Sequence, residues 1–229
     1  MTEKISGKIS IAIDGPSGAG KSTLAKSAAK KLGFIYVDTG AIYRTVGLAA
    51  QRAGVEPSDI PSVLSLLPGL QIDLRYENGV QRMYMKGADV TDFLRTPEIS
   101  IYASAVSAIP EVRTFLMDMQ RSLAERYDVV MDGRDIGTVV LPNASLKIFL
   151  TAEPEERARR RYLELVTAGS NVSFEQVLSD MELRDKNDSS RAAAPLEAAP
   201  DAIVLNTTGN SLERSEKIIF DLISEKLGL

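Results

Sequence analysis

The segment from Gly15 to Thr23 combines the residue types that bind phosphate groups. Its sequence, GPSGAGKST, matches the pattern G-x-x-x-x-G-K-[ST] at every fixed position. The glycines let the backbone approach a phosphate, backbone N–H groups face the anion, and Lys21 adds a positive charge. The hydroxyl of Ser22 is a suitable ligand for Mg²⁺. The predicted nucleotide-binding residues are Gly15, Pro16, Ser17, Gly18, Ala19, Gly20, Lys21, Ser22 and Thr23.

The surroundings of this motif distinguish a nucleotide site from a glycine-rich turn that matches by chance. A β-branched run at 8–14 precedes it, and 24–32 follows with helix formers and apolar residues at helical spacing. A strand, a loop and a helix in this order are what the motif requires. ATP is the predicted nucleotide, because no Asn is followed by Lys and the guanine-binding pattern N-K-x-D is therefore absent.

Further charged residues occur where predicted strands end. Asp132 closes the apolar run 129–131, which is the usual place for a carboxylate that serves Mg²⁺ beside a phosphate loop. A single Arg in a polar connection is usually surface decoration, but several near one phosphate loop would neutralise a second phosphate and a transferring phosphoryl group. The arginines in such positions are Arg44, Arg134, Arg184 and Arg191.

Composition narrows the possible chemistry. The 229 residues include no Cys and no His, so catalysis must use carboxylates, Lys, Arg, hydroxyls and an oxygen-bound cation. The net charge of −4 argues against a general nucleic-acid binder. No apolar run is long enough to span a membrane, and Met1–Lys8 is too polar for a signal peptide. We expect a cytoplasmic protein without nucleic-acid or membrane partners.

The order of predicted elements indicates an α/β fold. Five short apolar strands alternate with helices, which predicts a parallel sheet that carries ligands at the carboxyl ends of its strands. The predicted strands are 8–14, 34–37, 129–132, 146–150 and 202–205. The predicted helices include 41–53, 99–108 and 110–127, one that begins at Pro154, and two that begin at the capping boxes Ser173-x-x-Gln176 and Asn210-x-x-Glu213. Asp59 is predicted to cap a further short helix.

One segment does not fit the parallel sheet. Residues 70–76 and 80–86 alternate apolar and polar side chains around an Asn78-Gly79 turn, which predicts a β-hairpin. We interpret 63–96 as a small inserted module.

Several motifs together resemble the bacterial cytidylate (CMP) kinase family. These are GPSGAGKS, DTGAIYR, a helix that bears Ser104 and Arg113, DGRDIGT, and R-D-x-x-D-x-x-R at 184–191. The resemblance spans nearly the whole chain. It implies a P-loop NTPase fold with a five-stranded parallel sheet flanked by helices. The kinase core would be 1–62 and 97–229 with a short lid at about 154–191, and 63–96 would be an antiparallel β module inserted in the region that binds the nucleoside monophosphate.

The resemblance also implies an activity and a set of site residues. The activity is transfer of the γ-phosphoryl group of ATP, with Mg²⁺, to CMP and dCMP by a monomer. Catalysis would use Lys21, Arg134, Arg184 and Arg191, and Mg²⁺ would be bound by Ser22 and Asp132. CMP would contact Thr39, Tyr43, Arg44, Ser104, Arg113, Arg134, Asp135, Asp188 and Arg191. A carboxylate at Asp135 accepts from the exocyclic amine of cytosine, whereas uracil presents a carbonyl oxygen there.

Structural roles are open for the same residues. Thr39, Tyr43 and Arg44 follow Asp38 at a helix start, where an N-cap and a solvated face are equally expected. Asp135 could pair within its loop, and Ser104 could be a buried helix hydroxyl. The arginines at 157–161 are predicted to form a solvated helix face, because nearby glutamates offer i,i+4 pairs.

Two other functions are compatible with the sequence. One is a kinase of the same fold that acts on another small acceptor, such as UMP, AMP or a hydroxylated metabolite. The other is a nucleotide-dependent binding protein that performs no transfer.

Overall fold

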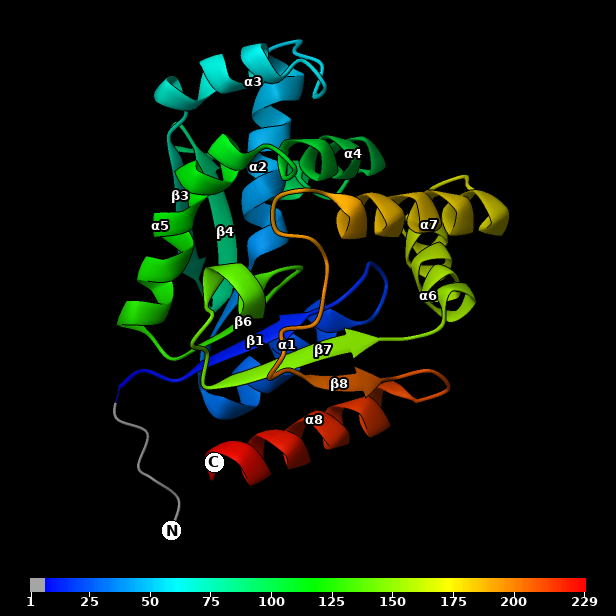
Figure 1. Ribbon diagram of the computed structural model, residues 1–229. Coiled ribbons are helices and arrows are strands. Elements are labelled where there is room, and N and C mark those ends of the chain that lie inside the picture. The colour runs from blue at the N-terminus through cyan, green and yellow to red at the C-terminus, as the bar shows by residue number, and fades with distance from the viewer. Residues whose placement is uncertain (1–6) are drawn as a thin grey trace. The chain divides into compact units, whose positions relative to one another are not determined.

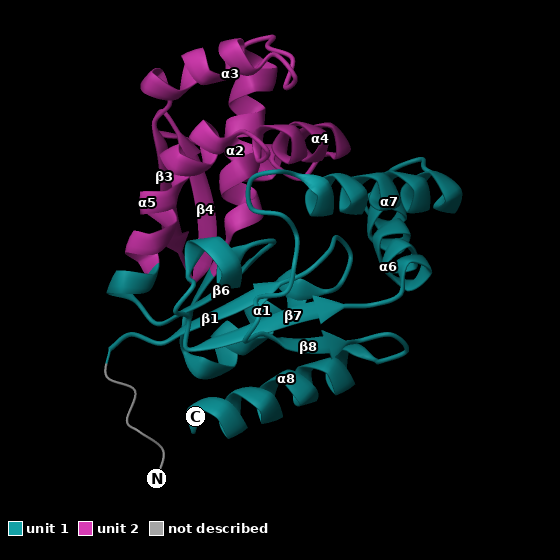
Figure 2. Ribbon diagram, viewed as in Figure 1, with its two compact units in different colours: residues 1–36, 124–229 teal, residues 37–123 magenta. Residues whose placement is uncertain are grey.

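A computed structural model describes residues 7–229, so most of the segment considered as a leader, Met1–Lys8, lies outside the described residues. The chain forms two compact units (Figure 2). Unit 1 contains residues 1–36 and 124–229, and unit 2 contains residues 37–123. Among the described residues, none of the helices is both long and apolar enough to cross a membrane.

Unit 1 is built on the predicted five-stranded parallel sheet, which has the order β2-β6-β1-β7-β8. Its strands are β1 (Ser10–Asp14), β2 (Ile35–Asp38), β6 (Val129–Gly133), β7 (Leu146–Thr151) and β8 (Ile203–Asn206), and β2 leads into unit 2. The register sets Asp14 opposite Gly133 on β6 and Phe149 on β7. The carboxyl end of the central strand is therefore flanked by two others, where α/β proteins bind ligands.

Two helices share an apolar core with this sheet (Figure 1). α1 (Lys21–Leu32) contributes small alanines, and α8 (Leu212–Leu227) contributes Ile219 and Ile223. The helices pack against the β-branched and leucine side chains of β1 and β7. The cap of α8 differs from the prediction: Ser211 accepts from the N–H of Arg214, so the N-cap is Ser211 rather than Asn210.

The helices α6 (Pro154–Thr167) and α7 (Phe174–Ser190) pack on each other around a small apolar cluster of their own (Figure 1). Tyr162 and Phe174 meet edge to face within it. The predicted Ser173 cap is confirmed by its bond from the N–H of Gln176, 3.1 Å long. The side-chain NH₂ of Gln176 donates to Asp180 at 2.8 Å.

Unit 2 combines helices with a three-stranded antiparallel sheet. Its elements are α2 (Thr39–Arg52), α3 (Ile60–Leu66), η1 (Leu67–Gly69), β3 (Ile72–Glu77), β4 (Val80–Met85), β5 (Ala88–Asp89), η2 (Thr91–Phe93), α4 (Pro97–Val106) and α5 (Pro110–Arg126), whose last turn belongs to unit 1. The hairpin is confirmed: Asn78 and Gly79 take φ values of 52° and 76°, as a tight hairpin turn requires. The short β5 was not predicted.

Unit 2 is larger than the module expected at 63–96. Its apolar core joins the hairpin to α2, α4 and α5 through residues such as Ile42, Met83, Ile99 and Leu116. The hairpin therefore cannot bury its apolar face alone, and it depends on the helices that precede and follow it.

Candidate active site

The predicted phosphate loop connects β1 to α1. Gly15, Gly18 and Gly20 have φ values of 146°, 70° and 89°, a region that L side chains rarely adopt. Side chains are also excluded by packing: a Cβ at Gly15 would collide with the carbonyl oxygen of Leu150, and one at Gly18 would lie 2.7 Å from the carbonyl oxygen of Arg157. The loop is therefore fixed by β7 and α6 in a shape that glycine alone permits.

Lys21 begins α1 and is buried inside this loop. Its ammonium donates to the carbonyl oxygen of Pro16 at 2.7 Å. Burial lowers the pKa of Lys21 well below its usual value, and the positive charges of Arg134 and Arg184 lower it further, against the opposing effects of Asp132 and Asp14. An anionic phosphate placed here would reverse this effect, so the site is electrostatically prepared for an anion.

Ser22 and Asp132 form the oxygen-rich part of the site. The Ser22 hydroxyl donates to one oxygen of Asp132 at 2.8 Å, and the hydroxyl of Tyr36 donates to the other at 2.8 Å. A hydroxyl and a carboxylate are the hard ligands that Mg²⁺ uses when phosphates and water complete its shell. The described residues hold no cluster of three or more His, Cys, Asp or Glu side chains suited to a metal.

Asp188 on α7 is the centre of a group of arginines. Its carboxylate lies 2.9 Å from Nε of Arg134, 3.6 Å from Arg191 and 3.9 Å from Arg184. Burial of Asp188 raises its pKa, but the three guanidiniums outweigh this and hold the pKa below its usual value. We call Arg134, Arg184, Arg191 and Asp188 the arginine cluster; the sequence predicted all four as site residues.

Asp14 belongs to the same region and was not predicted. It is 5% exposed, and it accepts hydrogen bonds from the backbone N–H groups of Ile136 and Gly137. These residues begin η3 (Ile136–Val140), directly after the buried Asp135. Burial raises the pKa of Asp14 to about 6, and the negative charge of Asp135 also raises it, whereas the two backbone N–H groups and Lys21 lower it. The β-strand pattern alone gave no sign that the last side chain of β1 bonds this loop.

Arg157 corrects the prediction of a solvated arginine face on α6. Its side chain is 7% exposed; it pairs with Asp185 at 2.6 Å and donates to the carbonyl oxygens of Ser17 and Ala152 at 3.0 and 2.8 Å. The expected i,i+4 pairing does occur between Arg160 and Glu156. Pro154 predicted where the helix begins, but the sequence did not indicate which of its arginines points into the protein.

Unit 1 also contains a groove of about 590 Å³. It lies between the first turns of α6 and the connection that follows β8, and its lining includes Arg160, Leu163, Thr208 and Gly209. Arg160 also donates to the carbonyl oxygen of Thr207 at 3.0 Å, so the two walls are joined by a hydrogen bond.

In unit 2, Arg44 and Thr39 lie at the start of α2. Asp38 caps this helix through the N–H of Ala41, as the structural alternative predicts, and its carboxylate also pairs with Arg44 at 2.9 Å. The buried Nε of Arg44 has no hydrogen-bond partner among residues 7–229, which leaves a donor available for a ligand. Gln81 of the hairpin holds the backbone of Asp38 from both sides, by accepting from its N–H and donating to its carbonyl.

Arg113, Tyr43 and Ser104 are connected within unit 2. The Arg113 guanidinium lies 5.6 Å from the centre of the Tyr43 ring and donates to the carbonyl oxygen of Ser107 at 3.2 Å. Ser107 in turn donates to the carbonyl oxygen of Ser104 at 2.8 Å. Arg113 is 5% exposed, a degree of burial unusual for a charged residue. The predicted residues therefore fall into two groups, one in each unit.

Comparison with known proteins places the sequence in a family. The family model for cytidylate kinase matches residues 11–225. A cytidylate kinase of Caldicellulosiruptor bescii is 50% identical over 215 residues, covering 94% of this chain and 95% of its own. A cytidylate kinase of Desulfitobacterium hafniense is 48% identical over 219 residues, covering 96% and 94%.

A solved structure with a similar fold is an uncharacterized protein of Eubacterium ventriosum, with a TM-score of 0.52, 14% identity and coverage of 95% and 99%. Because the identity is low, this similarity supports a shared fold and nothing more. The family match and the two relatives cover nearly all of the sequence, including the phosphate loop and the arginine cluster, and the chain belongs to the cytidylate kinase family.

Proposed function

We propose that the protein transfers the γ-phosphoryl group of ATP to CMP, and also to dCMP, to form ADP and the cytidine diphosphate. One observation carries the phosphoryl-transfer part of this proposal. The pairing of β1 with β6 sets Asp14, which precedes the phosphate loop, opposite Gly133, which precedes Arg134. Arg134 and Arg184 also lower the pKa of Lys21. Lys21, which we assign to the donor phosphates, is therefore close in unit 1 to the arginines that we assign to the acceptor and transferring phosphates. The relatives, which are named cytidylate kinases, support CMP as the acceptor.

The reaction needs no histidine. An oxygen of the CMP phosphate is already an anion, so it attacks the γ-phosphorus without a general base, and ADP leaves in line with it. Catalysis then depends on holding the two phosphates together and on stabilising the charge of the transferring group. We assign Lys21 to the ATP phosphates, Arg134, Arg191 and Arg44 to the CMP phosphate, and Arg184 to the transferring group.

We assign two roles to Asp188 in this scheme. Its carboxylate keeps three guanidiniums together before the acceptor binds, because it offsets part of their mutual repulsion. We further propose that it accepts from a sugar hydroxyl of the acceptor. Charge-assisted bonds of this kind are about twice as strong as neutral ones.

Selection of cytosine is assigned to Asp135, Arg113 and Ser104, with Thr39 and Tyr43 in the same acceptor-binding region. A carboxylate at Asp135 matches the exocyclic amine of cytosine and opposes the carbonyl of uracil. Phosphorylation of UMP is therefore the less favoured alternative, because a buried mismatch leaves polar groups unpaired.

Mg²⁺ is the proposed cofactor, since a hydroxyl and a carboxylate lie together at the end of the phosphate loop. Ser22 and Asp132 would hold it, and when bound it would neutralise charge on the ATP phosphates. We also propose that the adenosine of ATP occupies the groove between α6 and the segment after β8. Residues 154–191 would act as a lid over the core 1–62 and 97–229, and 63–96 would be an inserted module. We further propose that the protein is a cytoplasmic monomer.

The test is ADP release from MgATP with CMP, dCMP, UMP, AMP, GMP or shikimate at equal concentration. We expect CMP and dCMP to be preferred, and Asp135→Asn to reduce the ratio of kcat/KM for CMP over UMP by about 10-fold or more. Preference for another acceptor would retain the kinase and reject the assignment of Asp135. The absence of transfer to all six acceptors would favour a nucleotide-binding protein without kinase activity.

A further inference from the structure

Asp14 has no role in the proposed reaction, yet it is one of the most constrained charged residues of unit 1. Its Oδ1 accepts from the N–H of Ile136 at 2.8 Å and its Oδ2 accepts from the N–H of Gly137 at 2.7 Å. The next residue along the chain, Gly15, opens the phosphate loop. One carboxylate thus connects the start of that loop to a segment 122 residues later.

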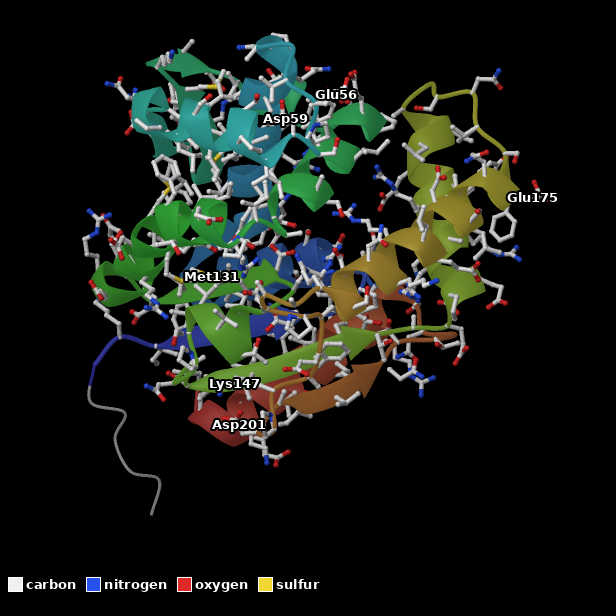
Figure 3. The ribbon with its side chains drawn as sticks, turned by 45° about the horizontal axis from the view of Figure 1, so that its top comes forward. Glu56, Asp59, Met131, Lys147, Glu175 and Asp201 are labelled. Atoms are coloured by element: carbon white, nitrogen blue, oxygen red, sulfur yellow. The ribbon has the colours of Figure 1, made fainter. Side chains whose placement is uncertain are left out.

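The segment after Asp135 is held from two sides. A Cβ at Gly137 would lie 3.4 Å from Oδ2 of Asp14 and 3.1 Å from Cδ of Lys147. The buried stem of Lys147 therefore backs the peptide that Asp14 bonds. Its ammonium is fixed by Asp201 at 2.8 Å, and Figure 3 shows the two side chains together. The backbone at Gly137 has little freedom to move while both contacts persist.

The charges around Asp14 are those of Asp135 and Lys21, with the Lys147 stem on the third side. Its pKa is about 6, so the carboxylate is mainly ionised at neutral pH and both oxygens can accept strongly. Protonation would weaken one of the two bonds.

We propose that Asp14 is a positioning residue that fixes the Arg134–Asp135 turn relative to the phosphate loop, and so sets acceptor alignment and base choice. This inference rests on the proposed function, which assigns the acceptor phosphate and the base to this turn. Asp135 directly precedes the peptide that Asp14 bonds, so any shift of the Ile136 N–H moves the carboxylate that would contact the base.

The mutational test uses Asp14→Asn, which keeps the size of the side chain. An amide oxygen can accept from one N–H, but the amide NH₂ then faces the other, so the turn must shift. The matched control is Asp128→Asn: Asp128 accepts from the N–H of Ile9 at 2.8 Å, near the opposite end of β1. The control therefore makes the same chemical change at a distance from the site.

We expect kcat/KM for CMP to fall up to about 100-fold in Asp14→Asn, the cost of a 1 Å misplacement of reacting groups. The ratio of kcat/KM for CMP over UMP should fall about tenfold, while the KM for ATP changes less than about threefold. Asp128→Asn should leave all three unchanged. The proposal would be overturned if the KM for ATP rose as much as kcat/KM for CMP fell, and the ratio of kcat/KM for CMP over UMP did not change.

A second measurement uses the unaltered protein and does not depend on activity. The amide ¹H signals of Ile136 and Gly137 should titrate together in NMR spectra, because both N–H groups donate to one carboxylate, with a midpoint near pH 6. Amide shifts that do not titrate, or that titrate apart, would overturn the role of Asp14. If the amides titrate together but CMP is not a substrate, the proposed function fails and the hydrogen-bonded turn remains.

Discussion

At the scale of single residues, two buried aspartates have pKa values that are shifted in opposite directions. Asp188 is surrounded by guanidiniums and keeps a low pKa, whereas Asp14 has only backbone N–H groups and Lys21 to offset its burial. The first is therefore charged at any pH near neutrality. Asp14 is ionised at neutral pH although burial disfavours its charge. Such residues are common where function rather than stability determines the residue type.

Asp188→Asn tests how far the arginine cluster depends on its central charge. Removing one partner of a buried ion pair leaves unpaired charge, so we expect the free energy of unfolding to fall by about 3 to 5 kcal/mol. Asp180→Asn is the control, because Asp180 is exposed on the same helix, and it should change stability by less than about 0.5 kcal/mol. Urea unfolding measures both; equal effects would contradict a central role for Asp188.

At the scale of elements, the Arg157 side chain connects α6 and α7 to the phosphate loop. Arg157 donates to the carbonyl of Ala152, directly after β7, to the loop carbonyl of Ser17, and to Asp185 of α7. The first turn of α6 is therefore hydrogen-bonded to the phosphate loop, although the helix also has the charged face that the sequence predicted.

Arg157→Met should separate these elements without removing apolar bulk. We expect a loss of about 3 to 5 kcal/mol in unfolding free energy, because Asp185 is left without its partner. The KM for ATP should also rise, since the Ser17 carbonyl loses its donor. Arg161→Met, which removes an exposed pair with Glu164, should cost less than about 1 kcal/mol. An unchanged KM for ATP would show that Arg157 does not support the loop.

At the scale of the whole molecule, Asp14 should contribute to the pH dependence of stability. Its pKa rises from 3.8 to about 6 on folding, so the folded state binds more protons between these values. Stability from this group is therefore greatest below about pH 4 and decreases as the pH rises through 6. Two pKa units correspond to about 3 kcal/mol.

The difference in unfolding free energy between the unaltered protein and Asp14→Asn isolates this effect, because other groups titrate in both. We expect the unaltered protein to lose about 2 kcal/mol relative to the variant between pH 4 and pH 7. Urea unfolding followed by circular dichroism at several pH values measures it. A difference that is constant or that grows in the opposite direction would contradict the raised pKa.

The sequence by itself determined the phosphate loop, the sheet and the hairpin. These depend on local patterns: glycine spacing before a helix, β-branched runs, and the Asn78-Gly79 turn. The motif order also identified the family. Arg134, Arg184 and Arg191 were singled out because several arginines near one phosphate loop suit phosphate binding, and the family resemblance added Asp188.

Only the tertiary structure decided which charges are buried and what they bond. Arg157 is buried, whereas Arg159 on the same helix is exposed and Arg160 and Arg161 are half-buried. The inward direction of Arg157 depends on the Ser17 carbonyl 140 residues earlier. The carboxylate of Asp14 finds its partners beyond 120 residues, in backbone N–H groups that carry no sequence signature. Long-range bonds to backbone atoms depend on packing rather than on residue type, so no spacing rule could have revealed them.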